Sequence, residues 1–179
     1  RFASQDQPAL DAQLYNASAH GETRLVQLLL KAGANIHSVN QEEGNNTALH
    51  AAAASGRQDT THTLLVRGAN VSARTIFGAT PLHHAANGGR ALICQLLVEH
   101  GADVNAQCDR GFTALHEAVE ETHNNTAAKL LQLGADPYVE NEDGDYALNL
   151  AERRYAADAS MLLRKAMGLP LCECFMCAG

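Results

Sequence analysis

The sequence predicts an all-α solenoid, a stack of one repeated helical unit, and two interleaved patterns carry this prediction. A Gly-Ala pair recurs at intervals of 35, 33 and 33 residues, beginning at Gly33, Gly68, Gly101 and Gly134. A Thr-x-Leu-His pattern keeps the same period from Thr47 to Thr80 to Thr113, and Tyr146 opens a weaker copy. A fixed period of roughly 20–50 residues is typical of solenoids and takes precedence over any local reading of the chain.

Within each unit the residues predict two short antiparallel helices, as the third unit shows. Thr80 is a good N-cap, and Pro81 suits the first helical turn, where its missing N–H is no loss. The sequence 87–89, Asn-Gly-Gly, interrupts this helix, and an apolar second helix follows from Ala91 to Val98. Gly101 then ends the second helix, because glycine readily takes the left-handed conformation found there.

The two helices of a unit differ in side-chain size. Alanines crowd the first helices, as at 51–53 and 85–86, whereas leucines crowd the second. This difference makes each unit a wedge, and a stack of wedges curves with the short first helices on its concave side. The residues after each second helix, such as 103–111, are polar and rich in turn formers, which predicts a loop between units.

The segment Thr80-Pro-Leu-His-His-Ala85 resembles the signature of the ankyrin repeat, in sequence and in period. The resemblance implies an α-solenoid of helix-turn-helix units joined by β-turn or hairpin loops. We expect an N-terminal extension at 1–7, an ankyrin-repeat domain at 8–168 and a Cys-rich tail at 169–179. The five expected repeats span 8–39, 40–74, 75–107, 108–140 and 141–168.

The first and fifth units depart from the repeat pattern. Ala12 to Tyr15 replace the Thr-Pro-Leu-His segment in the first unit, and Tyr155 replaces the inter-helix glycine in the fifth. Terminal repeats need a polar outer face, so we interpret both units as caps. The extra two residues between the first two units fall within 41–46, which predicts one lengthened loop and undisturbed helices.

Composition and charge limit the classes of partner. Of 179 residues 46% are apolar, enough for a continuous core, and no stretch of about 18 apolar residues is present to cross a membrane. The net charge is −7 overall, yet residues 99–145 hold eleven acids and two bases, a net of −9. Such a field disfavours nucleic acid and attracts basic partners, although charged loops are also commonly just solvated. We expect a monomer that contacts another protein through basic and apolar groups of that partner.

The five cysteines do not suggest a disulfide framework, which favours an intracellular, cytoplasmic location, with the nucleus left open. Arg1 in place of Met suggests a fragment of a longer chain. Cys172, Cys174 and Cys177 form a cluster with three readings: part of a zinc module, a lipidation site, or a tail without special chemistry. Three thiolates fall one ligand short of a closed zinc site, so no metal is predicted.

Nine histidines invite a metal or catalytic interpretation, and their positions argue against it. His50, His83 and His116 share one repeat position, where the ankyrin resemblance implies a structural imidazole bonded to the preceding threonine and to loop backbone. His83 and His84 are adjacent on a helix and point to different sides. No nucleophile-base set or phosphate loop is present, so we expect no catalytic, cofactor-binding or metal-binding residues and no enzyme activity.

Asn105 is a candidate modification site. Leu97 and the pair Asp103-Val104 precede it as in ankyrin repeats that an intracellular asparagine hydroxylase modifies, and the resemblance implies that chemistry here. The alternative is that the Asn105 side chain only bonds within its own loop.

The ankyrin resemblance also places the partner-binding surface, at the loop tips and the exposed positions of the first helices of repeats 2–5. Two phenylalanines at loop tips, Phe77 and Phe112, are half of all Phe in the chain, and exposed aromatic residues often anchor interfaces. The alternative is that each ring folds back onto a neighbouring loop. The predicted contact residues are Arg74, Ile76, Phe77, Asn87, Asp109, Arg110, Phe112, Glu120, Glu121, Glu140, Glu142, Asp143, Asp145 and Arg153.

Two functions fit these observations. The first is a non-catalytic protein–protein interaction module, a scaffold or adaptor. The second is the substrate-recognition arm of a larger enzyme, ubiquitin ligase or adaptor protein of which this chain is a fragment.

Overall fold

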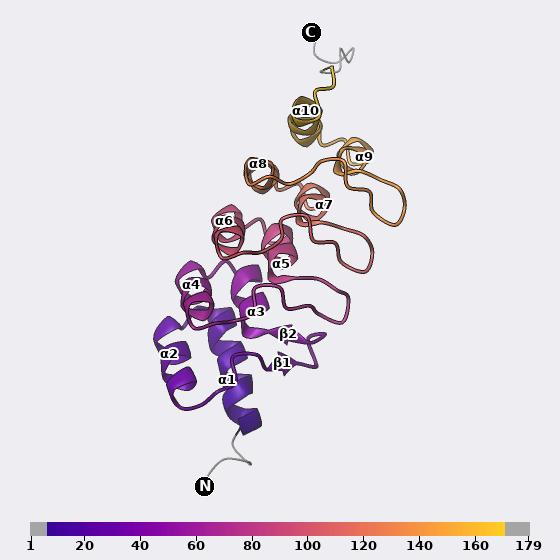
Figure 1. The fold of residues 1–179 in the computed structure, drawn as a ribbon. Helices are drawn as coiled ribbons and strands as arrows, with labels where there is room; N and C mark the ends of the chain where they lie inside the picture. Colours follow the sequence, from indigo (N-terminus) through magenta and orange to yellow (C-terminus); the bar gives the residue numbers. More distant parts are fainter. Residues whose placement is uncertain (1–6, 171–179) are drawn as a thin grey trace.

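A computed structural model of the chain describes residues 7–170, in which five helix pairs stack along one axis (Figure 1). The helices are α1 (Gln7–His20), α2 (Thr23–Lys31), α3 (Ala48–Ala54), α4 (Gln58–Val66), α5 (Pro81–Asn87), α6 (Ala91–Glu99), α7 (Ala114–Glu120), α8 (Asn124–Gln132), α9 (Ala147–Arg153) and α10 (Ala157–Ala166). The odd-numbered helices form one column, the even-numbered helices a second column beside it, and the loops project from the far side of the first. The predicted all-α solenoid is confirmed.

The core is continuous because the same repeat positions are buried in every unit. The first helices contribute one leucine each and the second helices another, all at most 7% exposed: Leu14, Leu49, Leu82, Leu115 and Leu148, then Leu29, Leu64, Leu97, Leu130 and Leu163. Alanines on the first helices, such as Ala85 and Ala118 at 0% exposure, let neighbouring helices approach closely. The helices α3, α5, α7 and α9 have seven residues each, while α4, α6, α8 and α10 have nine or ten, so most first helices are the shorter ones.

The structural role expected for the repeated histidines is confirmed. The ring Nδ1 of His83 accepts from the Thr80 backbone N–H at 3.2 Å, so the other ring nitrogen, Nε2, carries the proton and donates to the Phe112 carbonyl at 2.9 Å. His50 and His116 make the same pair of contacts, with the carbonyls of Ala79 and Asp145. Each imidazole therefore fixes the start of its own helix and bonds the loop of the next repeat.

The loops stack as regularly as the helices. Three of them close with the same bond four residues apart, from the N–H of Thr75, Cys108 and Asn141 to the carbonyls of Ala79, Phe112 and Asp145. Successive loop tips are then joined by backbone bonds, for example from Asp109 N–H to the Phe77 carbonyl at 3.0 Å. The tips form a continuous ridge beside the first helices.

The first loop is the lengthened one, as predicted. It forms a hairpin in which β1 (Val39–Asn40) pairs antiparallel with β2 (Asn46–Thr47), with Val39 opposite Thr47. Its tip contains Asn45 and Gly44, both with positive φ, so the two extra residues are accommodated in the turn and no helix is displaced.

The turn between the two helices of a repeat explains where the glycine pattern holds and where it fails. Gly89 has φ +71°, and a Cβ added to it would lie 2.8 Å from the ring of His123 in the next repeat. The corresponding Thr122 has φ +59°, and the position equivalent to His123 in the next repeat is Ala156, which has no long side chain. Tyr155, at φ +54°, follows the same geometry in the fifth repeat, beyond which the described chain has no further helix pair.

Candidate functional site

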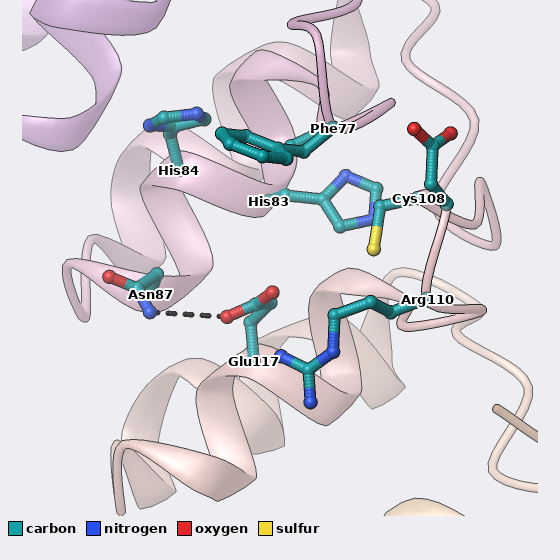
Figure 2. A pocket seen from close by; sticks show the side chains of 9 residues that line it. Phe77, His83, His84, Asn87, Cys108, Arg110 and Glu117 are labelled. Carbon is teal, nitrogen blue, oxygen red and sulfur yellow. Dashed lines mark hydrogen bonds between the residues drawn. The ribbon is translucent and has the colours of Figure 1, made fainter. Parts of the chain in front are cut away.

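A cavity of about 410 Å³ lies between α5 and α7, under the tips of the second and third loops (Figure 2). It is on the surface formed by the loop tips and the exposed sides of the first helices, which we call the loop face. The lining residues are Phe77, Ala79, His83, His84, Asn87, Cys108, Asp109, Arg110 and Glu117. Four of the predicted contact residues, Phe77, Asn87, Asp109 and Arg110, are thus brought together.

Phe77 provides an exposed aromatic wall at the rim. Its side chain is 67% exposed, although the backbone beneath it is fixed, because the Phe77 N–H donates to the Thr75 hydroxyl and its carbonyl accepts from Asp109. Figure 2 shows the ring extending over α5 toward His84. The predicted exposure of Phe77 is confirmed; its role in binding stays a prediction.

The opposite wall carries a half-buried carboxylate. Glu117 on α7 accepts a hydrogen bond at Oε2 from the Asn87 side-chain amide on α5, at 3.1 Å. Burial is the main cause that raises the pKa of Glu117, and the nearby Glu120 raises it further, while the Asn87 bond and Arg110 act in the opposite direction. The carboxylate is therefore poorly solvated and receives one neutral donor.

The histidines on α5 contribute uncharged surface. Burial lowers the pKa of His84, so the imidazole is neutral near pH 7, and the ring lies edge-on to that of His50 with centroids 5.2 Å apart. Burial likewise lowers the pKa of His83, whose ring is committed to the Thr80 and Phe112 backbone. The adjacent rings point to different sides, as predicted, and His84 is the more exposed of the two.

Phe112 does not take the place predicted for it, because the expectation that this ring is exposed is wrong. It is 2% exposed and lies 5.4 Å from the His116 ring, while the guanidinium of Arg110 stacks over it at 4.4 Å from the ring centroid. The alternative of folding back applies here: loop residue 112 points into the repeat and residue 77 points outward. The two rings therefore do not form a joint anchor.

Among the predicted acids, several are already occupied by partners within the chain. Glu120 accepts from Arg154 at 3.1 Å, and Asp145 pairs with Arg153. Glu140 accepts from the Tyr146 hydroxyl at 2.8 Å. The exposed acids Glu121, Glu142 and Asp143 remain on the loop face without an ion pair among residues 7–170.

Arg74, Ile76 and Asn105 lie outside the cavity. Arg74 joins two loops, because its Nη1 donates to the carbonyls of Gly78 and Gln107. Ile76 is 55% exposed at the second loop tip. Asn105 accepts at Oδ1 from the Asp136 N–H of the next repeat at 2.8 Å, so its side chain links two repeats rather than only its own loop. Hydroxylation of Asn105 stays a prediction.

Five of the nine lining residues are absent from the predicted contact residues: Ala79, the structural His83, His84, Cys108 and Glu117. The available signal was the repeat itself: residues 51, 84, 117 and 150 occupy one position on successive first helices, and they are Ala, His, Glu and Leu. Position-by-position variation of this kind marks a surface that the fold leaves free.

Within residues 7–170 no group of three or more His, Cys, Asp or Glu side chains is arranged to hold a metal ion. In the same part of the chain no helix is long and apolar enough to cross a membrane. The cluster of Cys172, Cys174 and Cys177 lies outside the described residues, so its three readings stay as they were.

The comparison with family models agrees with the repeat geometry. A model described as "Ankyrin repeats (3 copies)" matches residues 5–75 and again residues 60–141. A comparison with curated proteins gives no significant match. The chain therefore belongs to the ankyrin-repeat family, whose members are generally protein–protein interaction modules and typically not catalysts. The pair α9 and α10 continues the same arrangement beyond the matched residues.

Proposed function

We propose that this chain is a non-catalytic interaction module that binds a partner protein or peptide on the loop face of repeats 2–5. The observation that carries the proposal is the cavity between α5 and α7, where an exposed phenylalanine and a half-buried carboxylate meet. Covering an exposed aromatic ring with a partner lowers the free energy of the complex, and aromatic side chains are frequent interface anchors.

The charge of the surrounding surface supports a partner with basic groups. Glu121, Asp109 and Asp143 are exposed on the loop face, and the cavity adds Glu117 against the single guanidinium of Arg110. Opposite charges on a partner would speed its encounter and fix its orientation. The expected ligand is an extended segment with apolar and basic residues lying along the ridge of loop tips.

Selection from a displayed library of random peptides tests this proposal with the whole chain as the target. Selected peptides should be enriched in Lys or Arg together with apolar residues, and their affinity should fall at least about tenfold in Phe77→Ala. Leu92→Ala is the matched control, because Leu92 is 62% exposed on α6, in the column away from the loops. If the selected peptides bound Phe77→Ala and Leu92→Ala with the same affinity as the unmodified chain, the proposed binding site would be contradicted.

A further inference from the structure

The carboxylate of Glu117 has an acceptor that the described chain leaves unused. The Asn87 amide reaches Oε2, and no hydrogen bond from residues 7–170 reaches Oε1. The Arg110 guanidinium rests on the Phe112 ring, and no ion pair within 4.0 Å forms between it and Glu117. A carboxylate that is partly removed from water gains most from a cation that also donates hydrogen bonds.

The next junction along the stack shows what can fill such a position. There Glu120, one helical turn along α7, receives Arg154 of α9 at 3.1 Å, and Arg153 pairs with Asp145. At the junction of α5 and α7, the positions equivalent to Arg153 and Arg154 are Glu120 and Glu121. The chain therefore supplies Arg154 to the carboxylate at one junction, whereas at the other the equivalent helix position is acidic and the nearby Arg110 rests on the Phe112 ring.

The shape and walls of the cavity favour a long planar cation. Its volume of about 410 Å³ lies within the range of small ligand sites, so it has room for one extended side chain. Phe77 offers an aromatic face at the rim and His84 a neutral ring beside it. A guanidinium stacks on aromatic rings and is less strongly hydrated than an ammonium, so it loses less on entering a half-buried site.

We propose that the cavity between α5 and α7 binds the side chain of a single arginine of the partner. The guanidinium donates to the Glu117 carboxylate and lies against the Phe77 ring, and the exposed Asp109 adds a second acceptor at the rim. This inference rests on the interaction function proposed above and specifies the residue that the loop face recognises.

The test is an amide NMR titration of the whole chain with N-acetylarginine amide as the probe. Saturable shifts are expected at the amides of Asn87, Asp109 and Glu117, and N-acetylcitrulline amide, which has nearly the same shape without the charge, should give none. N-acetyllysine amide should bind several-fold more weakly. Glu117→Gln should weaken the arginine probe about tenfold, because a charge-assisted hydrogen bond is lost.

Glu121→Gln is the matched control, since it removes the same charge from the neighbouring exposed end of α7 and should change affinity less than about twofold. Phe77→Ala is a second variant of the site itself, at an exposed side chain that folding does not need, and should also weaken the probe. Equal binding of the citrulline or lysine probe, or equal effects of Glu117→Gln and Glu121→Gln, would overturn the arginine pocket.

The peptides selected in the library experiment separate this inference from the function it rests on. Peptides that lose affinity in Phe77→Ala but not in Glu117→Gln would leave the interaction role standing and overturn only the arginine pocket. Peptides that are indifferent to both variants, while the arginine probe still depends on Glu117, would overturn the proposed interaction surface for protein partners and support the pocket alone.

Discussion

The junction between the third and fourth repeats and the junction between the fourth and fifth share one framework. In each, a buried histidine of the earlier repeat donates to a carbonyl of the later one, from His83 to Phe112 at 2.9 Å and from His116 to Asp145 at 3.2 Å. In each, the two loop tips are joined by a backbone bond. The framework is therefore set by backbone contacts and by one repeated side chain.

The two junctions differ on the loop face. The first leaves a cavity in which Glu117 has no ion pair among residues 7–170, whereas the second is bridged by the ion pair of Arg154 with Glu120, beside the pair of Arg153 and Asp145 within the fifth repeat. The difference shows that residues that hold the stack and residues that set its surface chemistry occupy separate positions in the repeat. Substitutions can therefore be chosen to affect one role and leave the other intact.

The largest expected effect comes from acid, which weakens both junctions through their common histidine. Burial lowers the pKa of His50 and His116 to about 4 and also lowers that of His83, while an unfolded histidine titrates near 6.5. These rings are neutral in the native state, so their contribution is complete above about pH 6.5 and is lost as the pH falls toward about 4. A proton on Nδ1 would also remove the acceptor for the threonine N–H.

We expect the free energy of unfolding to fall by several kcal/mol, as an order of magnitude, between pH 7 and pH 4.5. Urea titrations followed by circular dichroism at a series of pH values measure it. The variant His62→Gln, at an exposed position of α4, should show the same pH profile as the unmodified chain. A stability that stays constant across this window would contradict the role given to the buried histidines.

The next effect is that of His83→Asn and His116→Asn, which should destabilise the two junctions equally. Asn149 occupies the same position in the fifth repeat and accepts from the Tyr146 N–H at 2.8 Å, so asparagine can preserve the start of the helix. It is too short to reach the next repeat, so the Phe112 or Asp145 carbonyl keeps only the N–H of its own loop as donor, and the volume of the imidazole is lost from a buried site. The expected cost is about 2 kcal/mol for each variant, measured by urea unfolding at pH 7. Markedly unequal costs would show that the framework differs between the junctions.

A smaller contrast concerns the inter-helix turns. Gly89→Ala should destabilise the protein by about 1–2 kcal/mol, since the residue has φ +71° and the added Cβ would contact the ring of His123. Thr122→Gly, at the equivalent turn of the next repeat, should change stability by less than about 1 kcal/mol, because relief of strain is offset by greater freedom in the unfolded chain. Thermal unfolding of the two variants, measured side by side, tests this difference in stability. A tolerated alanine at 89 would mean that His123 moves aside at little cost.

The repeat made the fold predictable to the level of individual contacts. Because Thr80 and His83 recur every 33 residues, their mutual bond and the bond to the next loop could be expected at three places, and all three are present. The 35-residue interval likewise located the lengthened loop that became the hairpin of β1 and β2. The period located the lengthened loop and the recurrence of the histidine, whereas the contacts of that histidine were implied by the ankyrin resemblance.

The site was less predictable because it depends on how non-repeated side chains orient. Phe77 and Phe112 both lie in polar loops, yet they occupy different loop positions, and only the first points outward. Glu117 counted as one acid among eleven in the sequence. Glu117 differs from Glu120 and Asp145 because Arg153 and Arg154 pair with those two acids and not with Glu117. This difference becomes visible only once α9 is packed on α7.

The smallest expected change in stability, and a direct probe of the contrast between the junctions, is Arg154→Ala. An exposed ion pair contributes about 1 kcal/mol or less, so the fold should tolerate its loss.

The substitution Arg154→Ala also frees Glu120 and should create a second binding position for N-acetylarginine amide, detected as new NMR shifts along α7 and α9. Affinity there should be lower than at Glu117, because Arg110 occupies the loop position that Phe77 holds one repeat earlier, so this position lacks the aromatic wall. Arg67→Ala, at the exposed end of α4, should create no such position. If Arg154→Ala gave no second set of shifts, an unpaired carboxylate on the loop face would be insufficient for arginine binding, and the aromatic wall of the first junction would have to be the deciding element.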